Sequence, residues 1–160
     1  MTTSPSQSGS KYWMDEWGAI NFAVFLIIVG GFWLVYPTIW SEIGRFFTDL
    51  RAVEFNGVPV FVEPIGNHAF LYGVATEFLG IMSLWLFGLT AIRFYRHSHQ
   101  RLISRTVTRA VFLLGLALFS WQLQIGALSF RSIVPLVIVL FGATLVVRGL
   151  WNIAFFKATQ

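Results

Sequence analysis

The run of residues 69–92, AFLYGVATEFLGIMSLWLFGLTAI, most constrains the fold, because it is apolar throughout and carries a single charge, Glu77. As a helix rising 1.5 Å per residue, it is long enough to cross a hydrocarbon core of about 30 Å. Three similar runs cover about 18–40, 106–126 and 132–156. Only 11% of residues are charged, against about 25% in soluble domains. We therefore predict an all-α, polytopic transmembrane four-helix bundle over residues 17–160, after a disordered tail at 1–16.

An amphipathic segment, SEIGRFFTDLRAVE, follows the first span at residues 41–54. Its apolar residues recur at helical spacing, with the charged residues on the opposite face. They are Ile43, Phe46, Phe47 and Leu50. Ser41 is the expected N-cap. The pattern fits a short helix lying in the membrane surface and, equally, a water-exposed helix packed on the bundle.

A small hairpin or extended flap is expected before the second span. Asn56–Gly57 separates two arms rich in β-branched and aromatic residues, and both turn residues of such a hairpin must accept positive φ. Pro59 confines its arm to a sheet edge. Pro64 and Gly66 close the segment.

Arginines concentrate between the second and third spans. The segment contains Arg93, Arg96, Arg101, Arg105 and Arg109. The positive-inside rule places this loop in the cytoplasm, and the amphipathic helix and hairpin outside the cell. With four spans, both termini are then cytoplasmic, as expected for a multi-pass protein of the cell membrane. We expect the arginines to contact anionic lipid headgroups at the cytoplasmic face, each contributing about 1 kcal/mol.

An outer polar layer is predicted around Glu77. Thr76 and Gln122 are expected at a similar depth, so Glu77 can be protonated or hydrogen-bonded to Gln122, which would hold two helices in register. Gly73 and Gly80 flank Glu77 on the same helical face. Small residues at these positions let a neighbouring backbone approach, which favours a Glu77 side chain that points toward the bundle or a partner.

An inner polar layer is predicted on the last span. Thr144, Arg148 and Asn152 recur every four residues and make one stripe, and Asn21 of the first span enters the membrane at a comparable depth. Arg148 lies within snorkelling range of the headgroups. Glu77 and Arg148 are on opposite sides of the midplane, roughly 10 Å apart along the axis, so no direct bridge is expected within one chain.

Several chemistries lack the residues they need. The sequence has no cysteine, which excludes disulfides, thiolate catalysis and iron–sulfur clusters. His97 and His99 lie in the arginine loop and His68 at the outer interface, so no histidine within a span is placed to bind haem, and no metal site or cofactor is expected. No nucleophile–base pair or phosphate-binding loop is present, and we expect neither enzyme activity nor nucleic-acid binding.

The second half of the chain resembles a group of small, uncharacterised four-span membrane proteins that are common in archaea. The likeness rests on YGVATEFLGIMSLWLFGLTAIRF, SRTVTRAVFLLGLALF and GATLVVRGLWNIA, and covers about Tyr72 to Ala154. The shared features are an apolar-Arg-Phe end to span two and a glycine six residues before an arginine in span four, here Gly142 and Arg148. The resemblance implies the four-span topology and brings no activity with it.

Two functional hypotheses remain. The first is a non-catalytic accessory subunit or scaffold, which works through helix–helix contacts in a homo-oligomer or a larger membrane complex. Glycine-flanked polar residues support it, with Gly73, Gly80, Gly142 and Gly149 as predicted helix-packing positions. The alternative is a small channel or transporter for protons or cations that uses Glu77, with His68 and Gln122 near its outer mouth. Lipid or quinone binding between helices would leave no distinct sequence mark.

Overall fold

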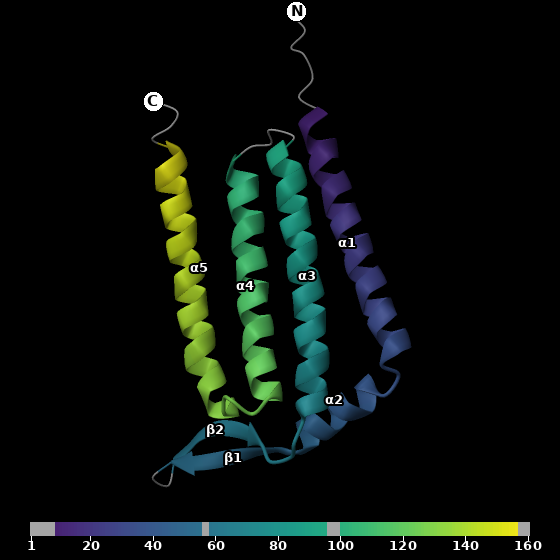
Figure 1. The fold of residues 1–160 in the computed structure, drawn as a ribbon, viewed down its shortest axis with the longest axis vertical. Helices are drawn as coiled ribbons and strands as arrows, with labels where there is room; N and C mark the ends of the chain where they lie inside the picture. The colour runs from purple at the N-terminus through teal and green to yellow at the C-terminus, as the bar shows by residue number, and fades with distance from the viewer. Residues whose placement is uncertain (1–8, 56–57, 96–99, 157–160) are drawn as a thin grey trace, which may run out of the picture. The chain divides into compact units, whose positions relative to one another are not determined.

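The computed structural model describes residues 9–55, 58–95 and 100–156 of the chain, and it is mostly helical (Figure 1). The elements are α1 (Gly9–Val35), α2 (Ile39–Thr48), β1 (Leu50–Phe55), β2 (Val58–Pro64), α3 (Ala69–Tyr95), α4 (Gln100–Gln124), the 3-10 turn η1 (Phe130–Ser132) and α5 (Ile133–Phe156). Four stretches are long and apolar enough to cross a membrane: Gly18–Val35, Ala69–Tyr95, Ile103–Gln124 and Phe130–Leu150. The four expected apolar helices are therefore present.

The first span is shorter at its C-terminal end than the sequence predicted. α1 ends at Val35, whereas the expected span ran to Trp40. Pro37 explains the difference, because proline lacks an N–H group and disfavours helical geometry in the residue before it. The chain divides at this proline into two compact units, 1–37 and 38–160, which are described separately. At its other end α1 begins at Gly9, within the predicted tail, of which residues 1–8 lie outside the described part.

The amphipathic segment forms α2, but its boundaries differ from the expectation. Thr38, not Ser41, occupies the N-cap position. Ser41 instead lies inside the first turn, where its hydroxyl donates a hydrogen bond of 2.7 Å to the Thr38 carbonyl. The helix ends at Thr48, so Leu50, which was predicted on its apolar face, is the first residue of β1.

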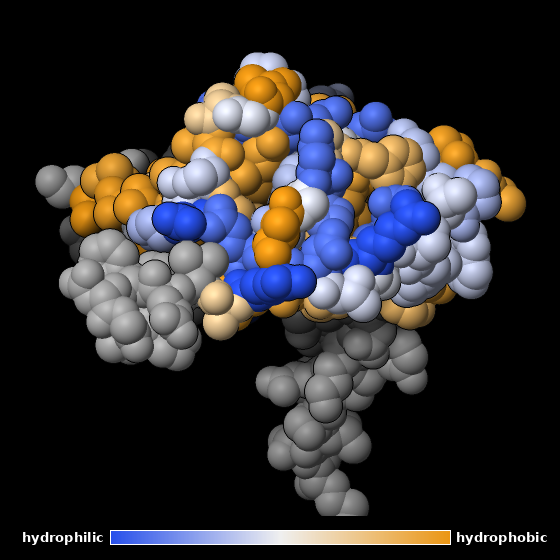
Figure 2. Space-filling model, turned by 90° about the horizontal axis from the view of Figure 1, so that it is seen from below, coloured by the Kyte–Doolittle hydropathy of each residue, from blue (hydrophilic) through white to orange (hydrophobic). Residues whose placement is uncertain are grey.

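The expected hairpin is confirmed by the pairing of β1 with β2. The two strands are antiparallel, from Leu50 opposite Pro64 to Phe55 opposite Val58, with an irregular register between Val53 and Glu54. Pro59 pairs with Glu54 beside that irregularity, in a sheet of two strands where every strand is an edge. The Asn56–Gly57 turn lies outside the described residues. Seen from the end that carries α2 and the hairpin, hydrophilic side chains gather over the middle of the face (Figure 2).

Helices α3, α4 and α5 form a layer with α4 between the other two (Figure 1). The buried apolar side chains are concentrated where α3 meets α4: Val74, Leu86 and Leu89 on α3, with Ile103, Ala110 and Ala117 on α4. On α5, Thr144 is the single buried residue among those whose burial is described. α5 meets α4 where Gly115 faces the side chain of Leu140. The core therefore lies between α3 and α4.

Candidate functional site

Three polar contacts join α3 to α4 at three levels. Near the hairpin end, Ser120 Oγ donates a hydrogen bond to the Tyr72 carbonyl at 2.9 Å. At mid-span, the fully buried Ser83 donates through Oγ to the Ala110 carbonyl, also at 2.9 Å. At the opposite end, Arg93 Nη1 donates to Thr106 Oγ1 at 2.6 Å. Each contact gives a polar group a partner inside an apolar span, so together they fix the register of the two antiparallel helices.

The predicted outer layer is spread over different environments. Thr76 is half-buried, and its hydroxyl donates to the Tyr72 carbonyl of its own helix at 2.8 Å. Glu77, the next residue, has an exposed side chain. Gln122 is half-buried near the end of α4, where its carbonyl accepts the N–H groups of Ala127 and Leu128 and so closes the following turn.

The glycines predicted at helix contacts fall into two groups. A Cβ atom on Gly73 would lie 2.8 Å from the Gln124 side-chain nitrogen, so the amide group of Gln124 on α4 occupies the space beside this glycine. Gly80, Gly142 and Gly149 have nothing within 4 Å of the position of such an atom. Gly115, which the sequence analysis did not single out, is the glycine that seats α5 on α4.

Two residues of the predicted inner layer, Thr144 and Arg148, lie on one side of α5 but differ in burial. Thr144 is buried, with its hydroxyl bonded to the Phe141 carbonyl at 2.7 Å, whereas Arg148 is exposed one turn further on. The Asn152 side chain lies outside the described part of the chain. Asn21 is half-buried on α1, which belongs to the other unit.

The arginines of the α3–α4 connection also differ from one another. Arg93 is half-buried and bonded to Thr106, while Arg105 and Arg109 are exposed on the first turns of α4. The side chains of Arg96 and Arg101 lie outside the described residues. Arg93 therefore takes part in helix packing, a role that its place in a basic loop did not indicate.

At the hairpin end of the α3–α4–α5 layer, the aromatic ring of Phe46 on α2 contacts three other rings. Its centroid lies 5.2 Å from the His68 ring, 6.4 Å from the Tyr72 ring on α3 and 5.9 Å from the Phe130 ring of η1. Edge-to-face and tilted pairs at these distances are favourable beyond the area that they bury. Phe46 thus joins α2 to the first turn of α3 and to η1, which leads into α5.

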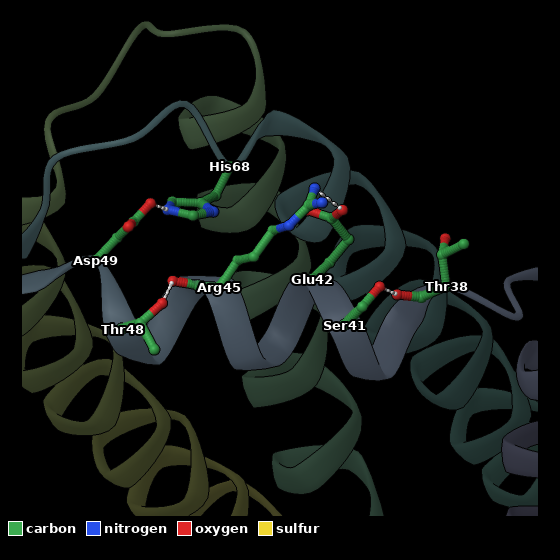
Figure 3. Close-up of polar contacts among 7 residues, drawn as sticks. All are labelled: Thr38, Ser41, Glu42, Arg45, Thr48, Asp49 and His68. Carbon is green, nitrogen blue, oxygen red and sulfur yellow. Dashed lines mark hydrogen bonds and ion pairs between the residues drawn. The ribbon is translucent and has the colours of Figure 1, made fainter.

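Two charged contacts surround this aromatic cluster. His68 is buried, and its Nε2 lies 3.2 Å from Asp49 Oδ2, although the pair lacks hydrogen-bond geometry (Figure 3). Gly66 runs directly beside them, since a Cβ atom there would lie 2.6 Å from the same carboxylate oxygen. On the other side, Arg131 Nε donates to Glu63 Oε2 at 2.7 Å, which ties β2 to η1.

The sequence analysis anticipated neither charged contact. Glu63 and Arg131 are 68 residues apart, so no local pattern connects them. The predicted topology places Glu63 and Arg131 near the outer ends of their neighbouring spans. This shared depth is the sequence signal that could have suggested the ion pair.

These contacts join the helices to one another and to the hairpin. Among the residues that the structure describes, no three histidine or acidic side chains lie close enough together to hold a metal ion. Comparison with family models, with curated proteins and with solved structures gave no match to this chain. Any functional conclusion therefore depends on the surfaces and contacts described above.

Proposed function

We propose that this chain is a non-catalytic integral membrane protein that serves as a scaffold or accessory subunit. It assembles through α5 with a second copy of itself or with another membrane subunit. The observation that carries the proposal is the unequal packing of α5, which rests on α4 along one face and exposes large apolar side chains elsewhere, among them Ile138, Phe141, Leu145 and Leu150.

A stripe of two glycines and two aliphatic residues lies on the face of α5 opposite α4. At 100° per residue, Ile138, Gly142, Leu145 and Gly149 fall within a narrow arc, on the other side of the helix from the buried Thr144. Both glycines have open space where a Cβ would lie, and Ile138 and Leu145 are 66% and 50% exposed. We name these four residues the α5 stripe.

The α5 stripe has the composition of a helix-packing face. Between membrane helices the hydrophobic effect gives no net drive, so association depends on close van der Waals contact. Glycines spaced by seven residues stay on one face and let a second backbone approach, with the aliphatic side chains packing beside it. A flexible lipid chain makes few close van der Waals contacts with such a face, whereas a second helix makes many.

The proposal is tested by the mass of the protein after gentle extraction into native lipid particles. We expect a homo-oligomer or a complex with a second membrane protein, and a lone monomer would contradict it. Gly142→Leu should dissociate the larger species because the added side chain fills the approach surface. Ala143→Leu, which places the same leucine side chain at an exposed neighbouring position, is the control and should leave it intact.

We also propose an orientation, with α2 and the hairpin outside the cell and both termini in the cytoplasm. Supporting it is the excess of arginines at the other ends of α3 and α4. Because the chain contains no cysteine, single-cysteine variants report one position each. In intact cells an impermeant maleimide should modify Ile65→Cys and spare Arg105→Cys until the cells are opened. The reverse pattern would invert the topology.

A further inference from the structure

The outer flank of α2 carries two exposed aromatic side chains. Trp40 and Phe47 are 61% and 65% exposed. They are seven residues apart and therefore lie on one side of the helix, about a quarter turn from the face that Phe46 turns toward α3. We name Trp40 and Phe47 the α2 flank.

The depth of α2 follows from the contacts of Phe46. This ring packs against Tyr72, one turn inside α3, and against Phe130, where the last apolar stretch begins. It also contacts His68, the residue before α3. A helix seated directly on the ends of two membrane spans lies at the level where hydrocarbon meets headgroups.

Several polar side chains of α2 have hydrogen-bond partners within the helix or at its N-cap (Figure 3). Ser41 Oγ and Thr48 Oγ1 donate to the carbonyls of Thr38 and Arg45, at 2.7 and 2.9 Å. Arg45 Nη1 lies 2.9 Å from Glu42 Oε1. Moving these groups into a less aqueous layer therefore breaks no bond to protein and costs less than moving unpaired ones.

We infer that the α2 flank is a lipid-binding surface, with Trp40 and Phe47 inserted at the boundary between headgroups and acyl chains of the leaflet on the α2 side. Aromatic rings are favoured at this depth because their apolar bodies leave water while their edges stay near polar groups. α2 is then an in-plane anchor that holds the hairpin at the membrane surface. The inference depends on the membrane insertion in the proposed function, but not on assembly through α5.

The inference selects between the two interpretations that the α2 sequence allows. If α2 is a water-exposed helix packed on the bundle, Phe47 is exposed to solvent. If α2 is a docking site for another protein, that protein covers Phe47. An in-plane anchor places it in lipid. The three environments differ in their access to oxygen, which dissolves in lipid, and to a nickel chelate, which stays in water.

Nitroxide labels on single cysteines test this in phosphatidylcholine vesicles that hold the 160-residue chain. Phe47→Cys and Trp40→Cys report the flank, and Arg45→Cys is the matched control on the polar side of the same helix. Val139→Cys, which is exposed on α5 a quarter turn from the α5 stripe, gives the value for the hydrocarbon core.

We expect the flank labels to show more oxygen access and less chelate access than the Arg45 label, at a depth shallower than that of the Val139 label. Flank labels as open to chelate as the Arg45 label would overturn the inference, and so would flank labels shielded from both reagents. If the Val139 label itself were open to chelate, membrane insertion by α5 would be wrong, and the proposed function would fail with it.

Discussion

Helices α3, α4 and α5 are similar in length and each is apolar enough to cross a membrane, yet the α3–α4 pair and α5 pack differently. Buried side chains recur along both members of the pair, many of them small, as with Ser83, Ala110 and Ala117. α5 has one buried residue, Thr144, within its described part. The difference shows that an apolar helix in a membrane finds its neighbours through small residues and polar contacts, because apolar character alone is satisfied equally well by lipid.

Under the proposed function, the same contrast separates a helix pair that is packed within the chain from a helix that packs on a partner. The three polar contacts between α3 and α4 lie about 16 Å apart along α3 at 1.5 Å per residue, so they control the whole length of the interface. α5 has no comparable contact to α4 among the described residues. The core therefore lies in the α3–α4 pair, and the assembly surface that we propose is on α5.

The largest effect that would sharpen this comparison is expected at Ala110. It is fully buried at the point where Ser83 binds its carbonyl. Ala110→Leu should lower the free energy of unfolding by about 1–3 kcal/mol or more, because the added side chain separates the helices. Ala143→Leu on α5 should change it by less than about 0.5 kcal/mol. Denaturant titration of the two variants in the same micelles compares them, and equal losses would contradict the account.

A smaller loss is expected at Gly115, the contact between α4 and α5. Gly115→Val should destabilise by about 1 kcal/mol, toward the low end of overpacking effects, because the end of the Leu140 side chain can turn aside. Gly88→Val adds the same group where a Cβ meets nothing within 4 Å, and serves as the control. If both valines cost the same, helix propensity and not packing explains the result.

Removal of the buried Ser83 hydroxyl should cost less again. Interhelical hydrogen bonds in membrane proteins are worth about 0.6 kcal/mol on average, and the Ser83→Ala loss should lie near that value. Thr76→Val is a fair comparison, because the Thr76 hydroxyl bonds its own helix and joins no second element. The Ser83 effect should exceed the Thr76 effect in unfolding titrations, and the opposite order would argue against a register role for Ser83.

The smallest effect is expected for the ion pair between Glu63 and Arg131. Arg131 is more than half exposed, so solvent screens the pair. A double-mutant cycle with Glu63→Ala and Arg131→Ala should give a coupling of about 0.2–1 kcal/mol that shrinks with added salt. A coupling energy of several kcal/mol that does not change with salt concentration would contradict this expectation. The ion pair between the hairpin and η1 would then stabilise the position of α5 far more than we propose.

Hydropathy predicted the four apolar helices because a bilayer crossing needs a long run of apolar residues that few other structures require. The hairpin could be predicted from Asn56–Gly57, since its turn chemistry is local. The first span was predicted to reach about Trp40, because apolar and aromatic residues continue past Pro37, whereas α1 ends at Val35, two residues before that proline.

The helix contacts could not be predicted, because hydropathy does not determine the lateral order of spans. Gly115 and Gly142 sit in equally apolar surroundings, yet the first lies against Leu140 and the second has open space. Ser83 looks unremarkable in sequence, and its partner is a backbone carbonyl, which every residue has. The Asp49–His68 and Glu63–Arg131 contacts depend on how α2 and the hairpin fold back on the spans.

The central claim, that the α5 stripe is covered by another protein helix, is tested most directly by its access to lipid in native membranes. A nitroxide at Leu145→Cys should be immobile and shielded from oxygen, while one at Val139→Cys, about a third of a turn away on the same helix, should be mobile and accessible. If the two labels are equally mobile and equally open to oxygen, the stripe faces lipid and α5 is not an assembly surface.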